Sequence, residues 1–173
     1  MDSLQIAETI NTLHPSPPLK ITSPQLTWFL ENYATRIMTP FRGIYLPLVP
    51  RRLLADESVA YWYESKAKLV GKSVDEIERE EGGERAYERL APVLREITAM
   101  LREDPSGPFF GGNEVGYVDF FWAGFLLFAR RIGEDVLEGV LERCDDGGDG
   151  GGGGDLHRRL LDAVAPWSVR CAY

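Results

Sequence analysis

The sequence predicts an all-α domain, and three observations lead to that prediction. Apolar residues recur at intervals of three and four residues in most segments that lie between prolines and glycines, which is the spacing of one helix face. Several of these segments begin with a helix-capping pattern. No segment alternates between apolar and polar residues as a half-buried strand does. With 173 residues, of which 44% are hydrophobic, the chain is long enough to form one domain with its own core.

Two helices are predicted before residue 40. The helix over 2–14 begins with Asp2, followed three residues later by Gln5 as in a capping box, and a run of prolines ends it. The helix over 23–40 begins at Ser23, an N-cap residue that precedes a proline. Both helices therefore have a start signal and a stop signal.

The next segment, residues 40–50, is apolar but contains three prolines, which predict an irregular buried crossing in place of a helix. A helix then fits residues 55–70, with Gly71 as its stop. Ser73 and Glu76 form a further capping box, which starts a short helix that ends at a pair of glycines.

The second half of the chain continues with helices. An amphipathic helix is predicted over 87–102, and after a turn rich in proline and glycine the segment 117–129 is apolar on all sides, which predicts the central helix of the core. Two more helices fit 132–141 and 156–164. Between them, residues 145–155 comprise seven glycines and four aspartates, and this composition predicts a flexible loop.

Composition excludes several classes of function. The 19 basic and 27 acidic residues give a formal charge of -8, which repels the phosphate backbone of nucleic acids. The longest apolar stretch, Phe120 to Ala129, is far shorter than the ~20 residues that cross a bilayer. The first twenty residues lack the basic region of a secretory signal, and the two cysteines lack metal-ligand spacing. A reduced, cytoplasmic protein without nucleic-acid or membrane partners is expected.

Three stretches together resemble a known family. Asp2 to Glu8, followed by the proline-rich linker, resembles the start of the helix that closes the thioredoxin-like half of glutathione S-transferases. Gly107 to Gly112, together with Tyr117-Val118-Asp119, resembles the folding signature of their helical C-terminal half. The middle of the chain, from Tyr61 through Gly71 to Glu76, is similar to the fungal branch related to bacterial lignin β-etherases.

The resemblance implies a glutathione S-transferase C-terminal-type helical bundle with a remnant of the thioredoxin-like domain. Residues 1–14 would be the last helix of that domain, 15–22 a linker, and 23–173 the helical domain, which includes the loop 145–155. Two features depart from the family. Gly116 stands where the family usually has Ser or Thr, so that only Asp119 remains to cap the helix that follows. The βαβαββ part, which carries the family's activating Tyr, Ser or Cys, does not precede Asp2.

The resemblance also implies candidate binding residues, while no catalytic residue can be assigned. Glutathione, the co-substrate, would bind at the helix start, where Asp2 pairs with its ammonium group and Ser3 donates to its carboxylate. The alternative is that both residues only cap a terminal helix. A hydrophobic electrophile would contact an apolar wall, although aromatic residues at helical spacing more often belong to the core. The candidates for this wall are Tyr33, Arg36, Ile37, Trp122 and Phe125.

The other chemically interesting side chains are expected to be inert. His14 and His157 have no partner at metal or triad spacing and are predicted to be solvated. Cys144 and Cys171 have no nearby base in the sequence and are predicted to be structural thiols. No metal site is expected.

Three functional hypotheses follow. The first is an enzyme that adds glutathione to a hydrophobic electrophile, or isomerises it through such an adduct, in fungal secondary metabolism; a homodimer is a possible assembly. The second is a non-catalytic helical binding module that lost the thiol-activating half. The third is that Met1 is an internal methionine of a longer reading frame.

Overall fold

A computed structural model describes residues 3–145 and 152–168 of the chain. All regular structure in these residues is helical, which confirms the all-α prediction. The elements are α1 (Ser3–Leu13), α2 (Pro24–Asn32), a π-helix η1 (Tyr33–Met38), α3 (Thr39–Arg52), α4 (Asp56–Val70), α5 (Val74–Glu81), α6 (Glu84–Arg102), α7 (Tyr117–Ile132), α8 (Glu134–Glu142) and α9 (Gly153–Ser168).

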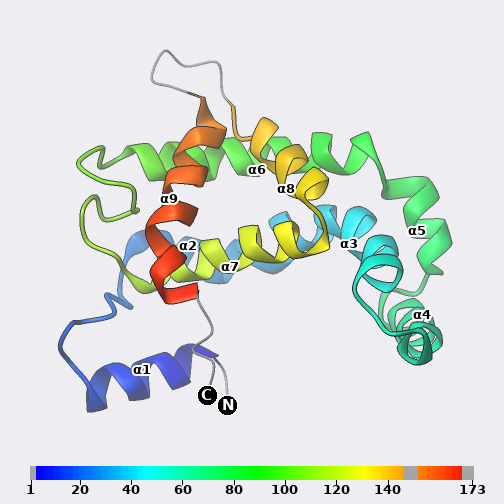
Figure 1. Cartoon of the computed structure of the whole chain (residues 1–173), viewed down its shortest axis with the longest axis horizontal. Helices are drawn as coiled ribbons and strands as arrows, with labels where there is room; N and C mark the ends of the chain where they lie inside the picture. The colour runs from blue at the N-terminus through cyan, green and yellow to red at the C-terminus, as the bar shows by residue number, and fades with distance from the viewer. Residues whose placement is uncertain (1–2, 146–151, 169–173) are drawn as a thin grey trace.

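The helix α7 runs through the middle of the bundle, as its sequence predicts. It packs against α2, α3, α8 and α9, while the long helix α6 runs along one side of the bundle and α4 and α5 lie at one end (Figure 1). Trp122, Phe125 and Leu126 on α7 are fully buried. Phe120 and Leu127 are only half-buried, so the wholly apolar surface of this helix is not covered on every side.

The start of α7 is fixed by Asp119. One carboxylate oxygen accepts the N–H of Gly116 at 2.7 Å, and the other accepts the N–H of Phe110 at 2.8 Å. Burial raises the pKa of Asp119, and these amide donors oppose that shift by stabilising the carboxylate. Asp119 therefore caps the helix without a hydroxyl at residue 116, and it also ties the preceding loop to the helix.

The prediction of an irregular crossing over 40–50 is wrong, because α3 continues through this segment. Pro40 lies in the first turn of α3, where no intrahelical donor is needed. Pro50 cannot donate to the carbonyl of Leu46, but the indole N–H of Trp62 donates to that oxygen at 3.0 Å. A tertiary hydrogen bond thus satisfies a carbonyl that the proline leaves free.

Close packing between α3 and α5 depends on Gly43. A Cβ atom at this position would overlap the backbone carbonyl of Glu81, so only glycine allows the two helices to approach this closely. The predicted helix boundaries around α5 are confirmed: Ser73 and Glu76 form a reciprocal capping box, and Gly71 ends α4 with a φ of 79°.

The ends of the chain's glycine-rich tract belong to the helical structure. The helix α9 starts at Gly153, three residues before the predicted start, and the N–H of Gly153 donates to the Asp145 carboxylate at 3.0 Å. A Cβ at Gly153 would overlap the carbonyl of Cys144. The rest of the predicted loop, residues 146–151, lies outside the described residues.

The N-terminal helix α1 lies beside the bundle and not within it (Figure 1). The linker is held by two hydrogen bonds, one from the N–H of Leu19 to the Asn11 side chain at 2.8 Å and one from the N–H of Tyr117 to the Leu19 carbonyl at 2.7 Å. Ile6 and Ile10 are nearly half exposed on α1. In the described part of the chain, no helix is long and apolar enough to span a membrane.

Candidate functional site

The candidate site is an open cleft of about 290 Å³ at the junction of η1, α3 and the end of α4. We call it the tyrosine cleft. Its lining residues are Tyr33, Ala34, Met38, Thr39, Arg42, Tyr45 and Val70.

The π-helix η1 brings the tyrosine cleft together. It inserts a wider turn between α2 and α3, and such insertions are rare and occur frequently at functional sites. The hydroxyl of Thr39 donates to the carbonyl of Ala34 at 2.9 Å across this turn. The ring of Tyr33 rests edge-on against Phe121, with 5.0 Å between ring centroids, so the core fixes the orientation of the cleft's first tyrosine.

Two phenol groups supply the hydrogen-bonding capacity of the cleft. Burial raises the pKa of Tyr33 above its ordinary value, and the neighbouring Tyr45 raises it further. Burial also raises the pKa of Tyr45, although the charge of Arg42 opposes this shift. Both hydroxyls are therefore protonated at neutral pH and can donate to an electron-rich oxygen.

Arg42 is held at the edge of the cleft by a forked ion pair with Glu81. Its Nε and one terminal nitrogen each donate to a carboxylate oxygen at 2.7 Å. These hydrogen bonds raise the pKa of Arg42 and lower that of Glu81. Glu81 is almost fully buried, and its backbone carbonyl lies against Gly43. The packing of α3 against α5 therefore positions the Glu81 carboxylate, and this carboxylate positions the Arg42 side chain.

The residues predicted for the apolar wall take different positions. Tyr33 lines the tyrosine cleft. Arg36 is exposed, pairs with Glu96 at 2.5 Å, and lies over the ring of Trp28 at 5.4 Å. It belongs to a surface cluster and does not line the cleft.

The other three predicted wall residues belong to the core. Ile37 and Trp122 have no exposed surface, and Phe125 is 1% exposed. Trp122 stacks on Phe125 with 4.9 Å between ring centroids. These side chains cannot touch a ligand in this structure, because neighbouring helices cover them. Aromatic and branched residues at helical spacing on an inner face more often pack against other helices than line a cavity.

The predicted glutathione contacts are not described by the structure. Asp2 lies outside the described residues, and Ser3 is described only as the first residue of α1, without its side chain. Their contacts with glutathione therefore stay a prediction.

Arg42 and Tyr45 are site residues that the sequence analysis missed. They fall on one helical stripe with Ala34 and Met38, at intervals of four, four and three residues. This periodicity is visible in the sequence. The prolines between residues 40 and 50 predict a non-helical segment, and in such a segment helical spacing would not place these residues on one face.

The prediction that His157 is solvated is wrong, because this side chain is fully buried. The indole N–H of Trp122 donates to Nδ1 of His157 at 2.9 Å, so this nitrogen carries no hydrogen. Nε2 lies 2.9 Å from the hydroxyl of Thr98 and is assigned as the donor. The sequence does contain a signal for burial, since His157 shares a helix face with Leu160 and Val164.

Cys144 is also buried, and burial raises the pKa of its thiol to about 12. A thiol with this pKa is not a nucleophile at neutral pH. His14 is exposed, as expected. Cys171 lies outside the described residues, and within the described ones no group of three His, Cys, Asp or Glu side chains could hold a metal ion.

Comparison with known proteins places these observations in a family context. Residues 26–147 match the family model of the glutathione S-transferase C-terminal domain. Over 152 residues, the chain is 26% identical to the glutathione S-transferase-like protein ustS of Aspergillus flavus, an alignment that covers 82% of this chain and 54% of that protein. The chain thus spans about half the length of the curated relative. No solved structure matches the chain.

Proposed function

The chain belongs to the family of glutathione S-transferase C-terminal domains, and from this premise we propose that it is the electrophile-binding part of a glutathione S-transferase-like enzyme. The observation that carries the proposal is the tyrosine cleft. It combines an apolar lining, from Met38 and Val70, with two phenol hydroxyls that stay protonated at neutral pH.

In the proposed reaction, the thiolate of glutathione adds to a carbon that is conjugated to a carbonyl group. As the carbon–sulfur bond forms, the π pair of the carbon–carbon double bond shifts toward the carbonyl carbon and the π pair of the carbonyl group moves onto its oxygen. A proton from water then adds to the α-carbon of the resulting enolate and restores the carbonyl group. Donors aimed at that oxygen stabilise the developing charge. We assign this role to the hydroxyls of Tyr33 and Tyr45, with Arg42 as a nearby positive charge that makes the cleft more favourable for an oxyanion.

Glutathione itself would bind near Asp2 and Ser3, as the resemblance implies. The residue that accepts the proton of the glutathione thiol stays unassigned, because Tyr33 and Tyr45 keep their own protons at neutral pH. A fungal secondary metabolite, a cytoplasmic location and a homodimer are further parts of this proposal, and each rests on the family resemblance.

A non-catalytic binding module is the second candidate. It is favoured by one observation, namely that the two tyrosines of the cleft are protonated at neutral pH and cannot accept the proton of the glutathione thiol. Such a module would hold the same apolar carbonyl compound without adding glutathione to it.

One experiment tests both candidates. A hydrophobic aryl enone is titrated into the wild-type protein, Tyr33→Phe and the control Tyr61→Phe, whose ring is 75% exposed on α4. We expect Tyr33→Phe to weaken enone binding by about tenfold, which corresponds to one hydrogen bond of ~1.4 kcal/mol. The control should bind as the wild type does. Equal binding by all three proteins would show that the enone does not use this cleft.

The addition of glutathione to the same enone then separates the two candidates. A rate above that of the uncatalysed reaction, reduced in Tyr33→Phe, supports the transferase. Binding without any such rate supports the module.

A further inference from the structure

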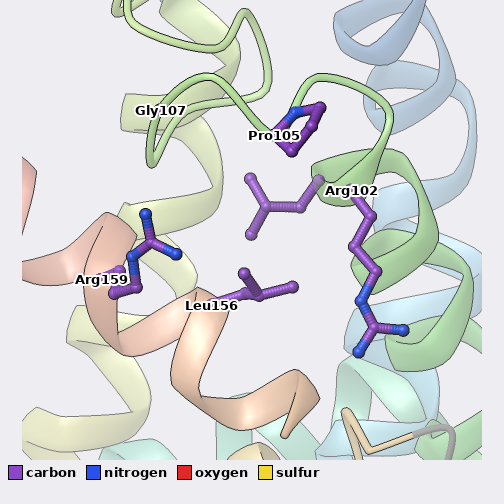
Figure 2. Close-up of a pocket in the computed structure, with 6 residues that line it drawn as sticks. Arg102, Pro105, Gly107, Leu156 and Arg159 are labelled. Carbon is purple, nitrogen blue, oxygen red and sulfur yellow. The ribbon is translucent and has the colours of Figure 1, made fainter. Parts of the chain in front are cut away.

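A second cleft, with different chemistry, opens between the end of α6, the loop that follows it and the start of α9. We call it the arginine cleft. It has a volume of about 290 Å³, just below the ~300–1,000 Å³ that small-molecule sites occupy. It shares no lining residue with the tyrosine cleft. The residues that line it are Leu101, Arg102, Pro105, Gly107, Leu156 and Arg159 (Figure 2).

The arginine cleft is apolar in its middle and basic at its sides. Figure 2 shows the side chain of Leu156 between those of Arg102 and Arg159, with Pro105 above. Arg102 also lies close enough to His157 for its charge to contribute to the low pKa of that buried ring. The guanidinium group of Arg159 lies beside this apolar surface and gives the cleft a positively charged side on a chain whose formal charge is -8.

The charge of Arg159 is not neutralised by the residues that the structure describes. Its neighbour Arg158 is paired with Glu138, whereas Arg159 forms no ion pair with any carboxylate in the described part of the chain. Two acidic residues of the adjoining loop have other partners: Asp104 accepts the N–H of Ser106 at 3.0 Å, and Glu103 accepts from Gln25 at 2.9 Å.

The loop that forms the upper wall of the cleft is held in place. Phe109 and Gly112 exchange two backbone hydrogen bonds, at 3.1 and 3.0 Å. A Cβ at Gly107 would overlap the backbone of Gly112, so the loop closes tightly on itself at this position. A fixed wall lowers the entropy that a ligand must lose on binding.

We propose that the arginine cleft binds a small amphipathic carboxylate, which places its hydrocarbon body on Leu101 and Leu156 and its carboxylate at the guanidinium of Arg159. A guanidinium donates two parallel hydrogen bonds to a carboxylate, a geometry that selects this anion over a neutral alcohol of the same shape. Because the two clefts share no lining residue, the proposal is independent of the transferase hypothesis.

Calorimetric titration with octanoate tests the proposal. 1-Octanol provides the same chain without the charge, and acetate the charge without the chain. The variants are Arg159→Met, which removes the charge and keeps an apolar stem, Arg159→Lys, which keeps the charge, and the control Arg158→Met on the same helix. All these positions are exposed, so the variants should fold, which circular dichroism checks.

We expect octanoate to bind the wild-type protein more tightly than either octanol or acetate. Arg159→Met should weaken octanoate binding by about tenfold, Arg159→Lys by less, and Arg158→Met should leave it unchanged. The proposal is overturned if octanoate does not bind, if octanol binds equally well, or if Arg159→Met binds octanoate as the wild type does.

Discussion

Protonation of His157 is costly in the folded protein because both of its ring nitrogens already have partners. A hydrogen on Nδ1 would face the indole N–H of Trp122, which can only donate. Complete burial adds a desolvation cost for the charged ring, and the positive charge of Arg102 adds a repulsion. Burial, followed by the charge of Arg102, lowers the pKa of His157 to about 3 in the folded state, whereas an unfolded histidine titrates near 6.5.

This difference predicts an acid-induced loss of stability. Between pH 6.5 and about 3, the unfolded chain binds a proton that the folded chain does not, so the free energy of unfolding falls as the pH falls. The free energy of unfolding should change by about 1.4 kcal/mol per pH unit in this range. Above pH 6.5 the pH dependence levels off, and the stability that neutral His157 contributes is fully present. Urea unfolding of the wild type and of His157→Gln between pH 7 and 5 measures it.

The second histidine of the chain provides the control for that measurement. His14 is exposed, so His14→Gln should retain the slope that His157→Gln loses. Carboxylates titrate mainly below pH 5 and affect all three proteins alike. An identical slope in His157→Gln and the wild type would contradict the assigned hydrogen-bond network.

At the scale of single residues, the sequence predicts which side chains face inward better than it predicts whether they line a cavity or lie in the core. Tyr33 and Trp122 are both predicted for the apolar wall, but Tyr33 lines an open cleft and Trp122 lies in the core. The reason is that a helical stripe specifies which residues face inward but not whether the inner side holds a neighbour or a cavity. Only the positions of the other helices decide this.

At the scale of helices, two glycines of similar sequence context have opposite roles. Gly43 lies where α3 meets the backbone of α5, and Gly124 lies on an exposed part of α7 where a Cβ would meet nothing within 4 Å. We expect Gly43→Ala to destabilise the protein by roughly 1–3 kcal/mol or more through overpacking. Gly124→Ala should stabilise it by about 0.5–1 kcal/mol through helix propensity.

Thermal unfolding of both variants checks this pair of predictions. Gly43→Ala should also disturb the tyrosine cleft, because the overlapping carbonyl belongs to Glu81, the partner of Arg42. Enone binding by Gly43→Ala is therefore expected to weaken, while Gly124→Ala binds normally. Equal stability of the two variants would mean that α3 and α5 do not approach each other as described.

The prolines of α3 lead to a further prediction at this scale. The carbonyl of Leu46 accepts from Trp62 because Pro50 has no N–H to offer. Trp62→Phe should cost about 1–3 kcal/mol by leaving this carbonyl without a donor. In a Pro50→Ala background the backbone supplies a donor again, so the same substitution should cost about 1 kcal/mol less. A double-mutant cycle followed by urea unfolding measures this coupling, and additive effects would contradict it.

At the scale of the whole molecule, the order of the helices was readable from the sequence, since caps and stops at Ser73, Gly71 and Asp119 act locally. The continuity of α2, η1 and α3 was not. It depends on Trp62, sixteen residues away from the carbonyl that it satisfies, and on a close helix contact at Gly43. Such compensation overrides the local preference of proline, and it depends on how α3 and α4 pack because the two partners of this hydrogen bond lie on different helices.

The whole molecule also sets the expected strength of glutathione binding. A family-type site holds the peptide backbone of glutathione along a sheet edge, and no strand occurs among the described residues. The predicted contacts at Asp2 and Ser3 then act alone. A few charge-assisted hydrogen bonds of ~1.5–3 kcal/mol each, reduced by the cost of immobilising the ligand, correspond to millimolar affinity.

We therefore expect calorimetric titration of the 173-residue chain with glutathione to give a millimolar dissociation constant. Ser3→Ala should weaken it further, because a hydroxyl donor to the γ-glutamyl carboxylate is lost, while Ser58→Ala on α4, an exposed position away from α1 (Figure 1), should not. Micromolar binding that Ser3→Ala leaves unchanged would show that glutathione is held by the helical bundle or by a second copy of the chain. In that case the tyrosine cleft, with its two protonated hydroxyls, would be the first place to look for it.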